Sequence, residues 1–170
     1  MSGGSLKLRG VVRAVLGDNI DTDIIFPGRY LNITDRELTA EHLFELAYPD
    51  LRAAIRPGEF VVAGKNFGCG SSREQAAAAL KFAGVGAVIA GSFARIFYRN
   101  SINLGMPAVI APEAAEACAV GDELELDLTA GEIRNVTRGC AVEAAKLDPR
   151  AVELISAGGL IPYLKRKHAA

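Results

Sequence analysis

The chain has 170 residues, of which 50% are hydrophobic and 23% are charged, with a formal net charge of −1. This length fits one domain, residues 1–170, and the near-neutral charge does not favour nucleic acid or another polyanion as a partner. The longest apolar runs, such as residues 84–91, are much shorter than the ~20 residues that a membrane helix needs, and the polar start of the chain lacks a signal-peptide pattern. We therefore expect a cytoplasmic protein without membrane contact.

Periodic apolar residues and turn formers predict the elements of the first half of the chain. They are a strand over 7–16, a loop over 21–34, a helix over 35–47 and a short connector between Pro49 and Pro57. The helix is predicted because Leu38, His42 and Leu46 recur four residues apart. Asp21 and Asp23 in the loop are interpreted as parts of a hydrogen-bonded turn rather than as metal ligands or acid–base groups.

The middle of the chain alternates buried strands with helices. The predicted strands span 60–63, 87–90 and 108–111, and the predicted helices span 71–82 and 93–104. Glu74, three residues after Ser71, is typical of a capping box, which would start the first of these helices at Ser71. The second helix is expected to bury a face that includes Ile96 and Phe97. A succession of strand, helix and strand predicts parallel strands with a right-handed crossover.

The last part of the chain has a different pattern. Leucines at every second position of 124–128 alternate with acidic residues, and residues 133–137 follow a turn, which predicts an antiparallel hairpin. Asp148 before Pro149 predicts the start of a helix, and a basic tail after it is expected to be a solvated helix end. The predicted fold class is α/β: a three-layer domain with a largely parallel central sheet and an added β-hairpin.

Residues 64–74 join the carboxyl end of a predicted strand to a predicted helix. They lack the Gly-Lys-Ser/Thr ending of a Walker loop, the third glycine of a dinucleotide fingerprint and the Gly-x-Ser-x-Gly pattern of a hydrolase elbow. Glycines let a ligand approach the backbone, a helix start offers free N–H groups, and Arg73 offers a planar fork for a carboxylate. The segment therefore predicts an anion site. The structural alternative is a helix cap by Ser71 or Ser72 beside a solvated Arg73.

The cysteine and histidine content limits other chemistry. Three widely spaced cysteines match neither a metal motif nor a disulfide framework, and two histidines are too few for a histidine-rich metal site. We therefore predict no metal ligands in this chain. Cys69 beside a helix start could act as a nucleophile, but no histidine lies near it in the sequence. Arg95 and Arg99, four residues apart on a predicted helix, face either a cleft or solvent.

Three motifs in this chain resemble those of one known family. They are GCGSSRE at 68–74, SFARIFYRN at 92–100 and DTDIIFP at 21–27. Each is similar to a motif of the small subunits of 3-isopropylmalate dehydratase and homoaconitase, which correspond to the swivelling domain of aconitase. The similarity runs in order from about residue 10 to residue 165, so it covers nearly the whole chain.

The resemblance implies a swivel-type fold and a hydro-lyase that is active only with a large subunit. By position, Ser71 would take the proton alpha to a substrate carboxylate, and Gly70, Ser72 and Arg73 would bind the substrate. The family's [4Fe-4S] cluster is held by cysteines of the large subunit, which implies that this chain binds no cofactor itself. The implied partners are that large subunit and a small polycarboxylate, and self-association of the isolated chain is left open.

The resemblance places substrate choice in the loop after Asp23, at Leu31, Asn32, Ile33 and Thr34. Family members with Tyr-Leu-Arg-Thr in this loop accept an extra carboxylate, whereas members with Tyr-Leu-Val-Tyr accept an isopropyl group. Asn32 replaces that arginine between two apolar side chains. We therefore expect isopropylmalate, a substrate of leucine biosynthesis, because an unpaired carboxylate in such a pocket would cost several kcal/mol.

The sequence is also compatible with other substrates and functions. Arg29 or Arg36 could reach the pocket and pair with a distal carboxylate, as a homoaconitase small subunit of lysine biosynthesis would require. A citraconate or dimethylmalate hydratase subunit belongs to the same class. From a different class, a non-catalytic domain that binds a small anion would explain residues 64–74 but not the other two motifs.

Overall fold

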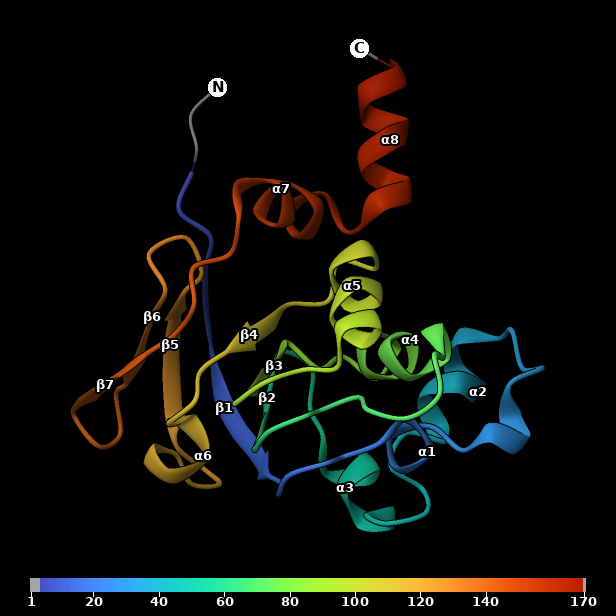
Figure 1. Cartoon of the computed structure of the whole chain (residues 1–170), viewed down its shortest axis with the longest axis horizontal. Coiled ribbons are helices and arrows are strands. Elements are labelled where there is room, and N and C mark those ends of the chain that lie inside the picture. Colours follow the sequence, from blue (N-terminus) through green and yellow to red (C-terminus); the bar gives the residue numbers. More distant parts are fainter. Residues whose placement is uncertain (1–3, 170) are drawn as a thin grey trace.

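The computed structural model describes residues 4–169; residues 1–3, in the polar start that lacks a signal-peptide pattern, and Ala170 lie outside the described residues. The strands form one sheet (Figure 1): β1 (Lys7–Val15), β2 (Phe60–Ala63), β3 (Ala87–Ala90), β4 (Ala108–Ile110), β5 (Glu123–Asp127), β6 (Glu132–Asn135) and β7 (Cys140–Glu143). The helices are α1 (Thr22–Ile25), η1 (Gly28–Tyr30), α2 (Arg36–Glu41), α3 (Pro49–Ala54), α4 (Glu74–Phe82), α5 (Arg95–Asn103), α6 (Ala114–Ala117), α7 (Pro149–Ala157) and α8 (Leu160–Ala169).

The strand order in the sheet is β4-β3-β2-β1-β5-β6-β7. Strands β1 to β4 pair in parallel, whereas β1, β5, β6 and β7 pair in antiparallel fashion. The predicted α/β fold with a largely parallel core and an added hairpin is therefore confirmed. The structure adds β7, a third antiparallel strand that the sequence pattern did not predict.

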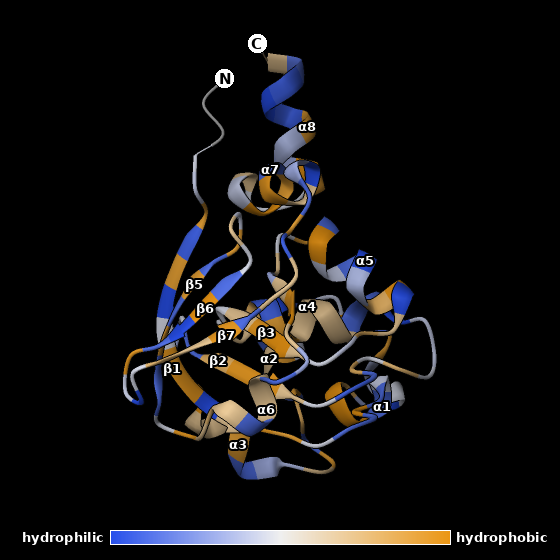
Figure 2. Cartoon of the chain, turned by 60° about the vertical axis from the view of Figure 1, so that its left-hand side comes forward, coloured by the Kyte–Doolittle hydropathy of each residue, from blue (hydrophilic) through white to orange (hydrophobic). Residues whose placement is uncertain are grey.

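The parallel strands lie between two hydrophobic cores, one on each face of the sheet. Val61 and Ala63 of β2 face a core that α1, α2 and α4 complete. Phe60 and Val62, at the alternate positions, face a second core that α6, α7 and the antiparallel strands complete. Figure 2 shows the resulting hydrophobic runs of β2 and β3. Burial on both faces explains why these strands were recognisable in the sequence.

The segment between β1 and β2 differs most from its prediction. The loop expected over 21–34 contains α1 and η1, and Asp21 caps α1 by accepting the N–H of Ile24 at 2.8 Å, which confirms its interpretation as a turn residue. The helix expected over 35–47 ends at Glu41, because the chain soon turns at Phe44, whose φ of 60° is not helical. Pro49 starts the unpredicted helix α3 at a position that suits proline.

Two predictions for the central helices were wrong. The capping box at Ser71 does not form, because α4 begins at Glu74 with Arg73 as its N-cap residue and without a side-chain cap. In α5, Phe97 is buried as expected, but Ile96 is 51% exposed. The buried face of α5 instead continues through Ser101 and Ile102. As a result, Ser71 and Ser72 before α4 and Ile96 on α5 are exposed.

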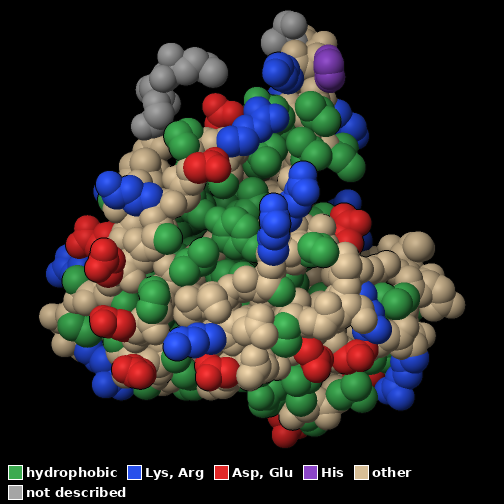
Figure 3. Space-filling model, in the orientation of Figure 1, with side chains coloured by type: hydrophobic (Ala, Val, Ile, Leu, Met, Phe, Trp, Pro, Cys, Tyr) green, Lys and Arg blue, Asp and Glu red, His purple; other side chains and the backbone are tan. Residues whose placement is uncertain are grey.

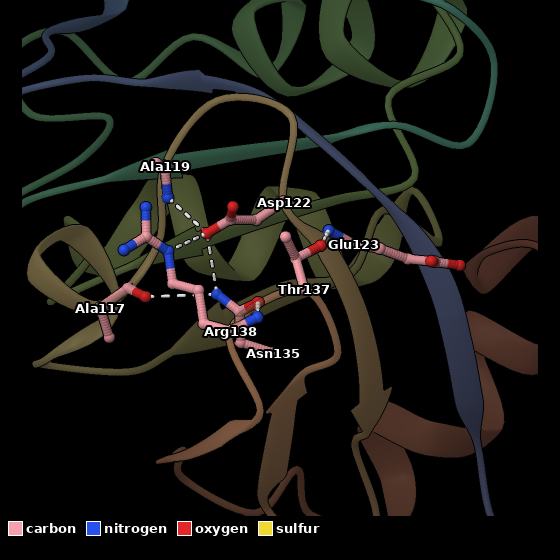
Figure 4. Close-up of polar contacts among 7 residues, drawn as sticks. All are labelled: Ala117, Ala119, Asp122, Glu123, Asn135, Thr137 and Arg138. Atoms are coloured by element: carbon pink, nitrogen blue, oxygen red, sulfur yellow. Dashed lines mark hydrogen bonds and ion pairs between the residues drawn. The ribbon is translucent and has the colours of Figure 1, made fainter.

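A buried polar cluster fixes the turn regions around the added strands. Asp122 accepts hydrogen bonds from the Ala119 amide (2.9 Å), the Asn135 side chain (2.9 Å) and Arg138 Nε (2.6 Å) (Figure 4). These donors, led by Asn135, hold the pKa of the Asp122 carboxyl below its ordinary value. The cluster therefore joins the segment before β5 to the turn after β6.

The carboxyl-terminal helices follow the predicted signals. Asp148 accepts the N–H of Ala151 at 2.8 Å and so caps α7, as expected from the Asp-Pro pair. The basic tail forms the last turn of α8, which confirms its interpretation as a helix end. Figures 1 and 2 show α8 projecting from the end of the molecule opposite α1.

Candidate active site

The three motifs of the sequence meet beyond the carboxyl ends of β1, β2 and β3. The amide of Thr22, after β1, donates to the carbonyl of Cys69 at 2.9 Å, and the amide of Phe67, after β2, donates to the carbonyl of Ser92 at 3.0 Å. These bonds tie the three segments side by side. The edge of a parallel sheet at its carboxyl ends is where α/β folds commonly bind ligands.

Gly68 allows the central segment to pack directly on α5. A Cβ atom at this position would lie 2.1 Å from Cγ of Phe97, and its φ of +82° is a conformation that other residues rarely adopt. The chain therefore passes close against Phe97 before it turns at Gly70. Ser71 and Ser72 follow this turn and are both exposed.

A pocket of about 230 Å³ opens where the motifs meet. Its lining residues are Thr22, Gly68, Gly70, Ser71, Ser72, Arg73, Ala94, Arg95, Ile96 and Phe97. The four predicted residues at 70–73 are thus brought together in one pocket. Arg95 was a candidate for a cleft, but Thr22, Ile96 and Phe97 were not predicted to join the pocket, because no local pattern brings these distant segments together.

The electrostatics of this pocket favour an anion with more than one charge. Arg73 and Ala94 are the N-cap residues of α4 and α5, and neither makes a side-chain cap hydrogen bond. The positive ends of two helix dipoles therefore flank the pocket. The side chains of Arg73 and Arg95 add two cations to its lining. A small polycarboxylate has the charge that matches this arrangement.

Arg73 is held by contacts from the Asp-Thr-Asp motif. Its Nη1 donates to Oδ1 of Asp23, and that oxygen also accepts the Gly28 amide at 3.1 Å. A Cβ atom at Gly28 would lie 2.9 Å from Nη2 of Arg73, so the guanidinium packs on a backbone that lacks a side chain. The hydrogen bond from Arg73, and to a lesser extent the Gly28 amide, holds the pKa of the Asp23 carboxyl below its ordinary value. Asp23 is therefore more than a turn residue.

The predicted substrate loop lies beside this pocket rather than in its lining. Among the residues that the structure describes, the pocket lining does not include Leu31, Asn32, Ile33 or Thr34. Leu31, Asn32 and Thr34 are exposed and Ile33 is half-buried. The Gln75 side chain of α4 donates to the Leu31 carbonyl at 3.5 Å, which places the loop next to the start of α4.

The two cations proposed as alternatives to Asn32 are engaged elsewhere. Arg29 pairs with Glu45 at 3.2 Å and lies 4.9 Å from the centre of the Tyr30 ring. Arg36 lies 5.1 Å from the centre of the Phe82 ring. Neither side chain lines the pocket described between residues 4 and 169.

Of the remaining candidate residues, Arg95 lies in the pocket, whereas Arg99 and Cys69 lie outside it. Arg95 lines the pocket, whereas Arg99, one turn further along α5, is exposed and outside the lining. Cys69 is half-buried and is not a lining residue, so a nucleophilic role for its thiol gains no support. Within residues 4–169, no three His, Cys, Asp or Glu side chains form a group that could hold a metal ion.

Comparisons with known proteins find relatives that cover most of the chain. Residues 46–113 match the family model of the aconitase C-terminal domain. The chain is 55% identical to the 3-isopropylmalate dehydratase small subunit of Moorella thermoacetica, over 89% of this chain and 91% of that one. The chain belongs to the 3-isopropylmalate dehydratase small-subunit family. Within this family, it is also 47% identical to the methanogen homoaconitase small subunit of Methanothermobacter thermautotrophicus, over 93% of this chain and 94% of that one.

A solved structure from the dehydratase family has the same fold. The crystal structure of 3-isopropylmalate dehydratase from Methanocaldococcus jannaschii matches with a TM-score of 0.88 and 41% identity, covering 96% of both chains. The swivel-type fold implied by the resemblance is therefore confirmed. Between residues 4 and 169 of the present chain, no helix is long and apolar enough to cross a membrane.

Proposed function

We propose that this chain is the small subunit of a hydro-lyase that interconverts 2-isopropylmalate and 3-isopropylmalate by dehydration and rehydration, in the cytoplasm. The observation that carries this proposal is the pocket in which Ser71, Ser72 and Arg73 face an anion site between two helix starts. Membership in the small-subunit family supports it. A small dicarboxylate whose carbon chain carries a hydroxyl group fits the charge of this pocket.

Each residue of the loop has a role in the proposed reaction. Ser71 takes the proton from the carbon alpha to a substrate carboxylate and returns it during rehydration. The fork of Arg73 donates two parallel hydrogen bonds to a carboxylate, and Gly70 and Ser72 offer further donors close to it. Thr22 is 3% exposed and lines the same pocket.

The proposed base cannot work in an open site. Ionising a hydroxyl with a pKa near 15.7 at pH 7 costs about 12 kcal/mol, at ~1.36 kcal/mol per pKa unit. A helix N-terminus recovers at most about 2 kcal/mol of this. Ser71 is exposed in this structure, so the remaining stabilisation must come from a partner that excludes water and adds donors. A large subunit is therefore part of the proposal.

The iron–sulfur cluster of the family does not fit this chain. A cluster needs several thiolates around one position, whereas no group of three candidate ligands occurs between residues 4 and 169. Cys118 and Cys140 both lie near Arg138, whereas Cys69 lies between β2 and α4, so the three cysteines do not gather at one position. We therefore assign the cluster to the large subunit, where it would supply Lewis-acid chemistry at the substrate hydroxyl.

The choice of isopropylmalate rests on the loop at 31–34 and on the two engaged arginines. A distal carboxylate needs a cation, and Arg29 and Arg36 both contact other groups of this chain. Asn32 is uncharged, and Leu31 offers exposed apolar surface beside it. Homoaconitate is the second candidate substrate, because a homoaconitase small subunit is 47% identical to this chain.

Reconstitution tests the proposed function. The purified chain is mixed with a 3-isopropylmalate dehydratase large subunit from the same genome, and isomerisation of 2-isopropylmalate is followed. The expected result is turnover by the mixture, no turnover by either subunit alone, and no iron in this chain alone. A non-catalytic anion-binding domain would add no activity to the large subunit, and that result would refute the proposal.

A further inference from the structure

The outer face of α5 beside the pocket is not covered by any part of the chain between residues 4 and 169. Ile96 lines the pocket and is nevertheless 51% exposed, while Arg95 and Arg99 on the same side of the helix are exposed as well. Figure 3 shows hydrophobic side chains gathered in a hollow between β4 and α5, with basic side chains along its edge. An apolar surface with cations at its rim is typical of a protein-binding surface.

Arg95 and Arg99 have no evident role in stabilising α5. Arg95 is the first residue of the helix, where a cation is unfavourable because the dipole is positive there. Among residues 4–169, no ion pair joins Arg95 or Arg99 to a carboxylate. By contrast, Arg13 and Arg138 each pair with a carboxylate of their own chain. Arg99 is therefore free to pair with a carboxylate of a partner, whereas Arg95 faces the pocket.

The position of this face identifies its occupant. Ile96 and Arg95 share one pocket with Ser71, so a polypeptide that covers Ser71 and excludes water must also lie against the start of α5. We propose that the outer face of α5 docks the large subunit, with Ile96 entering an apolar recess and with carboxylates of the large subunit facing Arg99. This inference rests on the proposed function, since it takes the large subunit as the partner.

The test compares matched variants by direct binding. Affinity for the large subunit is measured by calorimetry for Ile96→Glu and Arg99→Glu, with Ile161→Glu and Arg134→Glu as controls. Ile161 is an isoleucine with 66% exposure on α8, and Arg134 is an exposed arginine on β6. All four side chains are at the surface, so thermal unfolding should show that each variant keeps the wild-type fold.

The docking surface predicts a specific pattern of dissociation constants. Ile96→Glu should raise Kd by about ten-fold or more, as expected for an anchor at the centre of an interface. Arg99→Glu should raise Kd by about three- to ten-fold and reduce its dependence on salt, while kcat at saturating subunit is retained. Both controls should bind like wild type.

Two results would overturn the inference. One is wild-type affinity in both α5 variants, and the other is an equal loss in Ile161→Glu or Arg134→Glu. Because binding is measured without turnover, a complex that forms and shows this pattern but lacks isomerase activity would refute the proposed function alone. Failure of the wild-type chain to bind the large subunit would refute both.

Discussion

Asp23 and Arg73, which are 50 residues apart in the chain, form an ion pair at the edge of the pocket. Arg73 is the less accessible partner, with a side chain that is 17% exposed. The carboxylate thus holds one nitrogen of the guanidinium and leaves the others for a ligand. Asp23 therefore acts as a positioning residue for Arg73 in the proposed reaction.

Asp23→Asn should weaken substrate binding in the reconstituted enzyme. An amide keeps the shape of the carboxylate but loses the charge that fixes Arg73, so KM should rise by about five- to twenty-fold, equivalent to ~1–2 kcal/mol. Asp35→Asn is the control, because Asp35 is also exposed and accepts a backbone N–H, from Leu38, away from the pocket. An unchanged KM in Asp23→Asn, or an equal change in the control, would show that Arg73 does not depend on Asp23.

Gly28→Ala should disturb the same guanidinium from the other side. The new methyl group would lie 2.9 Å from Nη2 of Arg73, so the side chain must move from its present position. We expect a rise in KM of about ten-fold with little change in thermal stability. Gly17→Ala is the matched control, since a Cβ atom there meets nothing within 4 Å. Equal KM values for the two variants would contradict the packing role of Gly28.

Asn32→Arg should change substrate preference. A cation at this exposed position could pair with a distal carboxylate, so kcat/KM for homoaconitate should rise relative to isopropylmalate, by about ten-fold or more. Asn32→Gln adds length without charge and should keep the preference of wild type. If the wild-type enzyme already used homoaconitate as well as isopropylmalate, another cation would serve the distal carboxylate and the pathway assignment would move to lysine.

Asp122→Asn should lower stability in a pH-dependent way. The folded state lowers the pKa of Asp122, so the ionised carboxylate stabilises the protein above the unfolded pKa of about 4, and this contribution is lost as the pH falls through the lowered value. Denaturant unfolding should show a deficit of about 1–2 kcal/mol at pH 7 that shrinks below pH 4. A deficit that stayed constant with pH would exclude the charge of Asp122 as its cause.

The sequence predicted those elements whose signals are local. Strands β2 and β3 have the predicted bounds because they are short apolar runs buried on both faces, and α7 starts at its Asp-Pro signal. Helices α1 and α3 were missed because four and six residues give too little periodicity. Ile96 was placed on the same helix face as Phe97, because periodicity alone does not distinguish a buried apolar side chain from one at a surface.

The site was only partly predictable for a related reason. Gly70, Ser71, Ser72 and Arg73 are consecutive, so one loop identified them. The ion pair with Asp23 depends on the sheet order, which brings the segment after β1 beside the segment after β2. The parallel strands were predicted, but their neighbours in the sheet were not, and so Thr22, Gly28 and Asp23 gained a role only in the structure.

The most direct measurement of the proposed function is kcat of the reconstituted enzyme carrying Ser71→Ala. Ser156→Ala is the matched control, because Ser156 is also exposed but lies on α7, outside the pocket. Loss of a catalytic base that touches the substrate should lower kcat by about 10²–10⁴-fold, with normal folding and normal affinity for the large subunit, while the control keeps wild-type turnover. Near-normal kcat in Ser71→Ala would contradict the assignment of Ser71 as the base.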